Sequence, residues 1–328
     1  MGFASFIGNE LIVKSLQDSI RGNNLFHAYL LQGPPGSGTG RLAELFAQAI
    51  LCERGDGDAC GACIACHKME HDNHEDFVLY EKEKNSVKDE VIGQLQERIQ
   101  KKPYHGSRTV VVIHDAHTLT PRAQARLLKT LEEPTSGVVL ILLAEHTNNI
   151  ADTILSRCIV HGLRPLRRQQ ITDYLTKVHK LSQAEAELLS AVADGSIGKA
   201  EELRSQEGYQ EERRNANLLA ADLLTRQPFY RIAPRLKTLA TGKEQTQELL
   251  EHMERWYRDL LLLSLGESTP GLVNVDQKQE LLQHTGRYPL EVLMGLIRLI
   301  EQGKNDLERN AQPGYVLKNL VIRRLQQA

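Results

Sequence analysis

The strongest constraint on the fold is an apolar run, a glycine-rich turn and an amphipathic segment that follow one another directly. Residues 28–31 form the short apolar run, residues 33–40 read GPPGSGTG, and residues 41–51 repeat apolar side chains at helical spacing. An apolar strand that turns through glycines into a helix forms one half of a βαβ unit. This order predicts a parallel sheet covered by helices.

Further strand and helix patterns continue the alternation. Residues 110–113 (VVVI) are a continuous β-branched run, typical of a strand buried on both faces of a parallel sheet. Pro121 after Thr120 predicts a helix over 121–133 with Thr120 as its N-cap, and residues 138–143 predict another strand. We therefore expect an α/β domain over residues 1–163.

The chain changes character after Pro165, where strand-like runs nearly vanish and helical patterns take over. The predicted helices cover residues 167–180, 182–193, 197–206, 210–225, 245–266, 276–284, 289–303 and 313–326. These helices predict two all-helical parts, residues 164–208 and 209–328.

The net charge of the chain and its lack of membrane-span and signal-peptide patterns indicate where it is located and which partners it is unsuited to. Lys and Arg number 40 and Asp and Glu 42, a net charge of −2, which argues against coating nucleic acid by bulk charge. No apolar run approaches the roughly 20 residues of a membrane span, and the N-terminus lacks signal-peptide features. We expect a cytoplasmic chain with no membrane partner, in which cysteines favour a metal site over disulfides.

Four of the five cysteines lie close together, with the spacing C-x7-C-x2-C-x2-C over residues 52–66. Four thiolates at such short gaps can close a tetrahedron around zinc. The predicted ligands are Cys52, Cys60, Cys63 and Cys66. An iron–sulfur cluster is the alternative, but its motif would continue with x3-C-P, whereas His67 and Lys68 follow here. The sequence predicts a structural zinc module inserted after the helix over 41–51 that follows the glycine-rich turn, and Cys158 is expected to be a buried thiol.

The glycine-rich turn resembles a phosphate-binding loop that has lost its charged group. The working motif is Gly, four residues, Gly, Lys and then Ser or Thr. Gly33 and Gly38 are in place, but Thr39 stands at the Lys position and Gly40 at the hydroxyl position. In a shifted register Arg41 takes the Lys position, although Leu42 then replaces the Mg²⁺-binding hydroxyl.

A second part of the phosphate site is incomplete too. Asp115 follows the 110–113 strand where a carboxylate would hold Mg²⁺, but Ala116 occupies the place of a second, water-activating carboxylate. The candidate site is a degenerate nucleotide site with doubtful ATP binding. Its residues are Gly33, Gly36, Gly38, Thr39 and Asp115. A plain strand-to-helix turn, with Asp115 as a turn residue, is the alternative.

Several motifs occur in one order that matches a known family. They are HAYLLQGPPGSG, the four-cysteine module, HEDF (74–77), VVVIHDAHTLT, RLLKTLEEP (126–134), LSRC (155–158) and the C-terminal stretch 310–325. Together they resemble the clamp-loader branch of the AAA+ family, and within it the delta-prime type of bacterial DNA polymerase III subunit. The gamma/tau type carries an intact Lys and Thr, so Thr39, Gly40 and Ala116 favour the delta-prime type.

The resemblance implies a pentameric loader, with delta and gamma/tau subunits as partners, that opens the sliding clamp and places it on primed DNA. It implies an AAA+ domain over 1–163, a small helical lid over 164–208 and a helical collar over 209–328. The chain would be a non-hydrolysing stator within a DNA-directed DNA polymerase holoenzyme, with no ATPase activity of its own expected. Arg157 of the SRC motif would be an arginine finger that acts in trans on a neighbouring ATPase subunit.

Two other functions remain open from the sequence. The chain could be an active ATPase of the gamma/tau type, with Arg41 in place of the Lys. It could also be a zinc-dependent nucleic-acid-binding module, although residues 52–70 hold no aromatic side chain for base stacking. Lys199 lies near the family's second nucleotide-sensing position and receives no role.

Overall fold

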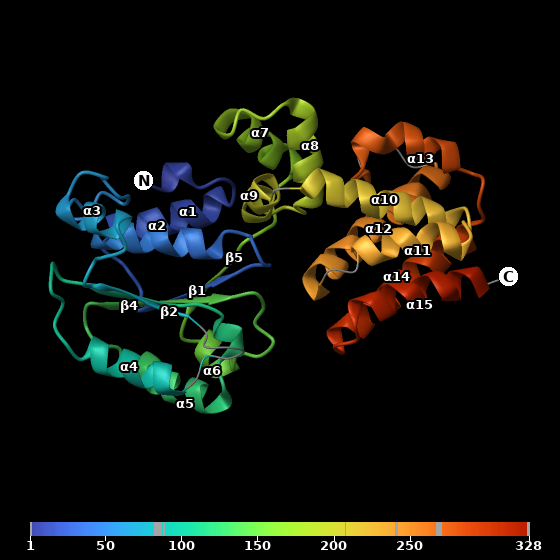
Figure 1. The fold of residues 1–328 in the computed structure, drawn as a ribbon. Coiled ribbons are helices and arrows are strands. Elements are labelled where there is room, and N and C mark those ends of the chain that lie inside the picture. The colour runs from blue at the N-terminus through green and yellow to red at the C-terminus, as the bar shows by residue number, and fades with distance from the viewer. Residues whose placement is uncertain are drawn as a thin grey trace. The chain divides into compact units, whose positions relative to one another are not determined.

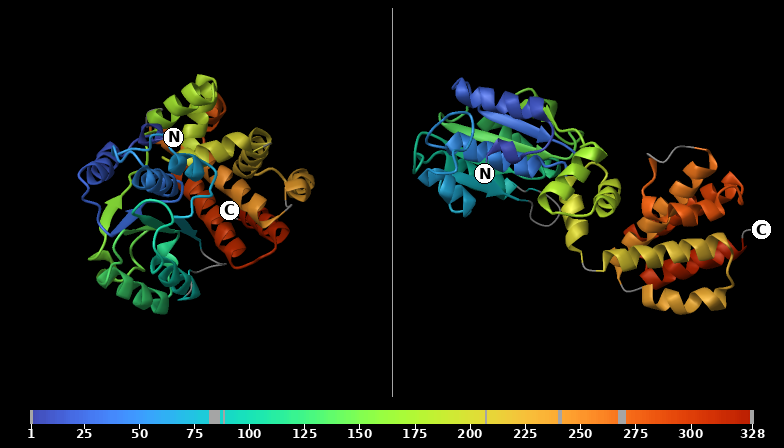
Figure 2. Two further views of the ribbon diagram at one scale, coloured as in Figure 1. Left: turned by 90° about the vertical axis from the view of Figure 1, so that its left-hand side faces the viewer. Right: turned by 90° about the horizontal axis from the view of Figure 1, so that it is seen from above.

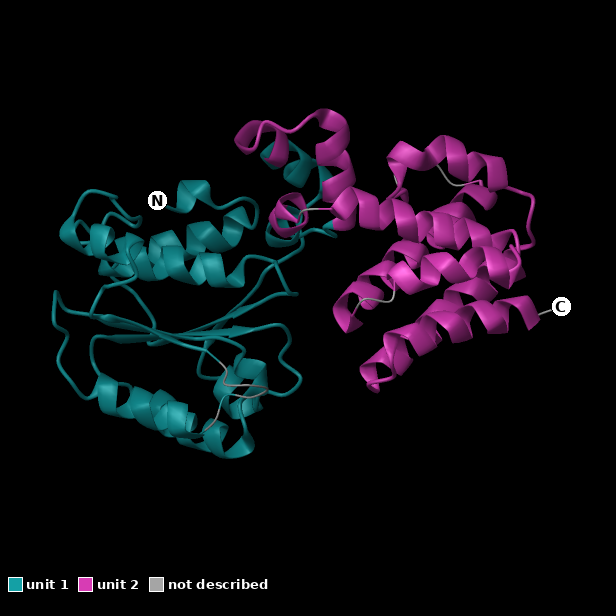
Figure 3. Cartoon of the chain, in the orientation of Figure 1, with its two compact units in different colours: residues 1–174, 193–200 teal, residues 175–192, 201–328 magenta. Residues whose placement is uncertain are grey.

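The computed structural model describes residues 2–81, 87, 89–206, 208–239, 242–266 and 271–326. The chain divides into two compact units, residues 1–174 with 193–200 and residues 175–192 with 201–328 (Figure 3). The division into domains at 1–163, 164–208 and 209–328 stays a prediction. Within the described part of the chain, no helix is both long enough and apolar enough to cross a membrane.

The first unit is built on a five-stranded sheet in which every pairing is parallel (Figure 1). The strands are β1 (Ala28–Gln32), β2 (Phe77–Tyr80), β3 (Thr109–Ile113), β4 (Val138–Ala144) and β5 (Ile159–Gly162). Their order is β2-β3-β4-β1-β5, so β1 lies between β4 and β5. This confirms the predicted parallel α/β fold, including the strands expected at 28–31, 110–113 and 138–143. The sequence patterns did not predict β2 and β5.

Helices cover both faces of the sheet because its central strands are apolar on both sides. The helical elements are η1 (Phe3–Ser5), α1 (Glu10–Arg21), α2 (Thr39–Leu51), α3 (Ile64–Glu70), α4 (Asp89–Ile99), η2 (Ala116–Thr118), α5 (Pro121–Glu132) and α6 (Asp152–Leu155). Tyr29 and Leu31 belong to the core under α1 and α2, whereas Ala28 and Leu30 belong to the core over α4 and α5. Figures 1 and 2 show the two helical layers on opposite faces.

The second unit is helical, as the periodicity after Pro165 predicted. The remaining helices are α7 (Arg168–Val178), α8 (Gln183–Val192), α9 (Ile197–Ser205), α10 (Tyr209–Leu224), α11 (Phe229–Leu239), α12 (Lys243–Ser264), η4 (Val275–Gln277), α13 (Lys278–His284), α14 (Leu290–Glu308) and α15 (Pro313–Gln326). Of these, α7 and α9 each include residues of both units. α12 packs against α10 and α14, and its Trp256 and Tyr257 are fully buried in the core. The Tyr257 hydroxyl donates a hydrogen bond to the Ala220 carbonyl at 2.8 Å, which satisfies this buried polar group.

Candidate functional site

The glycine-rich turn connects the carboxyl end of β1 to the first residue of α2. Gly36 has φ +74° and Gly38, the N-cap of α2, has φ +90°. Side chains with a Cβ atom rarely adopt this left-handed region, so the tight turn depends on glycine at both positions. The turn leads directly into a helix N-terminus, the arrangement that binds phosphate in nucleotide sites.

Residues near the start of α9 lie directly against this turn. The Ser196 hydroxyl donates a hydrogen bond to the Gly36 carbonyl at 2.8 Å, and it accepts one from the Lys199 backbone N–H at 3.0 Å. A Cβ atom at Gly36 would lie 2.0 Å from the Ser196 hydroxyl oxygen. The structure therefore brings the backbone of Lys199 to the phosphate loop, and Ser196 is a contact that the sequence patterns missed.

The Lys and the hydroxyl side chain that a working phosphate loop needs are absent at positions 39 and 40. Thr39 is the first residue of α2, and a Cβ atom at Gly40 would lie 3.3 Å from Cε1 of His114. Arg41, the substitute in the shifted register, forms an ion pair with Glu44 at 3.0 Å on the exposed side of α2. The loop keeps its backbone shape while its charge-neutralising side chain is missing.

Asp115 lies just beyond β3, in a left-handed conformation with φ +51° that caps η2. The structure places ligand-type atoms of Asp115, His117 and Glu145 within 4.8 Å of one another. The backbone N–H of Glu145 donates to Nδ1 of His117 at 3.3 Å. This contact engages Nδ1 of His117 with the backbone of the residue that follows β4.

This cluster was only partly predicted, because His117 and Glu145 were not assigned to a site. Asp115 follows β3 and Glu145 follows β4, which are adjacent parallel strands. Polar residues that follow neighbouring parallel strands meet at one edge of the sheet, where ligands of α/β proteins bind. That pattern is present in the sequence and could have identified both residues.

The four clustered cysteines come together as predicted, with their sulfur atoms all within 4.8 Å of one another. Cys52 follows α2, Cys63 is the N-cap of α3, and Cys66 lies within α3. The sulfurs of Cys60 and Cys66 are 3.9 Å apart. A zinc ion with Zn–S distances of about 2.3 Å holds its sulfurs about 3.8 Å apart at tetrahedral angles, so this spacing fits a tetrathiolate site.

The surroundings of the sulfurs suit thiolates that share a cation. Backbone N–H groups donate to the sulfurs of Cys52 and Cys63 at 3.4 Å. The Ala62 N–H lowers the pKa of Cys60 to about 6, whereas burial raises the pKa of the Cys66 thiol. A buried thiolate needs a compensating positive charge, and four sulfur ligands are the donor set of structural zinc.

Arg157 lies between α6 and β5 in the first unit, and its guanidinium is partly exposed. Its Nη2 contacts Oε1 of Glu132 at 3.0 Å. Its Nη1 donates to the Thr153 carbonyl at 2.9 Å and to the Ser156 hydroxyl at 3.3 Å. Glu132 received no role from the sequence, so its pairing with Arg157 is new information from the structure.

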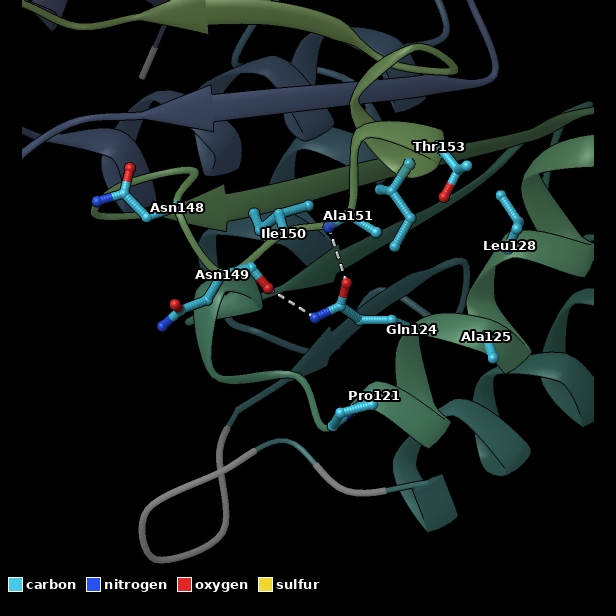
Figure 4. A pocket seen from close by; sticks show the side chains of 10 residues that line it. Pro121, Gln124, Ala125, Leu128, Asn148, Asn149, Ile150, Ala151 and Thr153 are labelled. Carbon is cyan, nitrogen blue, oxygen red and sulfur yellow. Dashed lines mark hydrogen bonds between the residues drawn. The ribbon is translucent and has the colours of Figure 1, made fainter.

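A separate cavity of about 460 Å³ lies between α5 and the loop that leads into α6 (Figure 4). Gln124 bridges its wall, because its amide donates to the Asn149 carbonyl at 2.7 Å and accepts from the Ala151 N–H at 2.9 Å. None of the residues that the sequence assigned to a site lines this cavity. Thr153, which holds Arg157 through its carbonyl, is part of the lining.

The parallel sheet and the glycine-rich turn before α2 define an α/β protein with a degenerate phosphate loop, and comparison with known families places it more closely. A family model described as DNA polymerase III, delta subunit, matches residues 8–167. A second model, for the C-terminal part of the DNA polymerase III delta subunit, matches residues 210–320. The chain belongs to the clamp-loader proteins, and within them to the delta-prime subunits of bacterial DNA polymerase III.

Individual relatives agree with this membership. The delta-prime subunit of Bacillus subtilis is 28% identical over 96% of both chains. The delta-prime subunit of Pseudomonas aeruginosa is 33% identical over 57% of this chain and 58% of its own length. The tau subunit of Bacillus subtilis is 26% identical over 98% of this chain but only 61% of its own length.

Proposed function

We propose that this chain is the non-hydrolysing stator of the DNA polymerase III clamp loader, and that it supports ATP-dependent loading of the sliding clamp on primed DNA. The observation that carries the proposal is the state of the phosphate loop. Its glycines keep the tight left-handed loop shape, while Thr39, Gly40 and Ala116 replace the groups that bind and activate nucleotide. A chain that keeps the shape of the phosphate loop but lacks the groups that hydrolyse ATP fits a structural role in a loader.

The proposed partners are delta and gamma/tau subunits in a pentamer, together with the sliding clamp and primed DNA, in the cytoplasm. The support comes from the similarity to proteins that are delta-prime and tau subunits of DNA polymerase III. The helical part over 209–328 would serve as the collar that assembles the ring. Mass spectrometry of proteins retained by the tagged chain tests this partner set.

We assign Arg157 the role of an arginine finger in trans. Its neighbours Ile159 and Val160 on the edge strand β5 are 39% and 44% exposed. Because β5 lies at the edge of the described sheet, its outer side is open to contact with another protein. The guanidinium would contact the γ-phosphate of ATP held by the subunit that docks there.

We also propose that the four-cysteine cluster holds a structural zinc ion. The supporting observations are the 3.9 Å sulfur separation and the N–H groups directed at the sulfurs. Zinc would tie the 52–66 segment to the end of α2 and stabilise it. No catalytic step is assigned to this metal.

The deciding experiment measures clamp loading on primed DNA and total ATPase activity in a reconstituted loader. Arg157→Ala should lower ATPase partially and clamp loading further, since one finger acts on one of several sites and contributes on the order of 10³-fold there. Arg157→Lys should restore little, because an ammonium lacks the planar fork. Arg108→Ala, which removes a cation that hydrogen-bonds to Asn23 and not to Arg157 or Glu132, should leave both activities unchanged. Full activity of Arg157→Ala would contradict the finger.

A further inference from the structure

The ion pair between Glu132 and Arg157 joins the end of α5 to the segment between α6 and β5. Both side chains are partly exposed, at 47% for Glu132 and 36% for Arg157. An ion pair between such exposed groups contributes little to the stability of the fold.

We propose that Glu132 is a positioning residue that holds the Arg157 guanidinium ready for a neighbouring subunit's nucleotide. This inference rests on the proposed finger role of Arg157. The Glu132 carboxylate and the Thr153 carbonyl contact Nη2 and Nη1 respectively, so they constrain the guanidinium from two directions. An arginine fixed before the partner arrives loses less side-chain entropy when it contacts phosphate.

The guanidinium can be held in this way and still bind phosphate. It carries five N–H donors, and the contacts to Glu132, Thr153 and Ser156 use at most three of them. Nε–H and the second N–H of Nη2 have no acceptor among the residues that the structure describes. Two donors therefore remain for γ-phosphate oxygens. This favours an ion pair that prepares Arg157 for phosphate over one that prevents Arg157 from binding it.

The test compares Glu132→Ala with Glu133→Ala in the reconstituted loader. Glu133 is the adjacent carboxylate and makes no ion pair with the described part of the chain, so it is a matched control. Glu132→Ala should lower the Arg157-dependent kcat for ATP by roughly 3- to 10-fold with KM for ATP unchanged. Glu132→Gln should restore part of this loss, because its amide oxygen still accepts from Nη2.

A double variant shows whether Glu132 acts through Arg157. In an Arg157→Ala loader, adding Glu132→Ala should change nothing further. In the isolated chain, the ion pair should slow the rotation of the Arg157 Nη groups, so that NMR shows separate Nη resonances. These resonances should merge in Glu132→Ala, where rotation is faster, but not in Glu133→Ala. This spectroscopic readout is independent of loader activity.

The outcomes separate the two ideas. No effect of Arg157→Ala would refute the finger itself. An effect of Arg157→Ala without any effect of Glu132→Ala would refute only the positioning role. A rise in ATPase in Glu132→Ala, or a further loss in the Arg157→Ala background, would also overturn that role.

Discussion

Among single residues, Cys158 offers an internal reference for the four-cysteine cluster. It lies outside the four-sulfur cluster, and burial raises its pKa to about 11. Cys66 is fully buried among the cluster sulfurs. Cys158 is only half-buried, and not fully buried as the sequence predicted, because it lies in the turn before the edge strand β5. The two thiols have different expected roles because Cys66 lies among three other sulfurs and Cys158 does not.

Replacing Cys66 by Ser should abolish metal binding, because three remaining sulfurs leave the buried site open. The purified chain should carry about one zinc ion, and Cys158→Ser should keep it. Elemental analysis of each purified variant is the measurement. Iron in the unmodified chain, or equal zinc in Cys66→Ser, would show that the cluster is not this zinc site.

A second residue-scale prediction concerns the phosphate loop. The isolated chain should turn over no ATP, and Thr39→Lys with Gly40→Thr should not recover hydrolysis while Ala116 is present. The structure adds an obstacle, because the new Cβ at residue 40 would lie 3.3 Å from His114. Steady-state ATPase and nucleotide-binding assays check this, with His114→Ala as an added change that should ease binding. Turnover by the unmodified chain that disappears in Asp115→Ala would contradict the stator role.

Among the elements, α5 begins with the N-cap that the sequence predicted. The Thr120 hydroxyl accepts a hydrogen bond from the Ala123 N–H at 3.2 Å, and Pro121 occupies the first helical position. Thr120→Ala should lower the free energy of unfolding by about 1 kcal/mol, because a helix N–H loses its acceptor. Thr120→Ser should keep most of that stability. Denaturant unfolding of both variants tests this, and equal losses would argue against the cap.

α11 shows an element that the local pattern did not reveal. Pro234 lies inside this helix, where a proline removes a backbone N–H and disfavours a helix. Ile232 and Leu236 on the same helix are almost fully buried in the core of the second unit. Tertiary packing of this apolar face stabilises the helix against its unfavourable proline.

At the scale of the whole molecule, buried and half-buried histidines should make stability depend on pH. Burial lowers the pKa of His27, His74 and His161 in the first unit and of His284 in the second. An unfolded chain takes up these protons near pH 6.5 while the folded chain resists them. The contribution is therefore fully present above about pH 6.5 and is lost as pH falls toward the lowered folded values.

The melting temperature should consequently fall between pH 7.5 and pH 5.5, and the first unit should be affected more. His161→Gln should flatten this dependence, whereas the exposed His71→Gln should not. Scanning calorimetry with zinc measured at each pH separates histidine protonation from metal loss. A melting temperature that is constant over this range would contradict the effect of burial.

The sequence by itself determined the parallel α/β layout, the helical second half and the cysteine cluster. Each of these depends on local signals, namely hydrophobic period, glycine placement and short ligand spacing. The tertiary structure alone decided which distant side chains meet. Ser196 reaches Gly36 across 160 residues, Glu132 pairs with Arg157, and Arg213 from a highly charged stretch is buried against Asn274 across 61 residues. Such pairings arise from how whole elements pack, because no local period or propensity specifies the partner of a polar side chain.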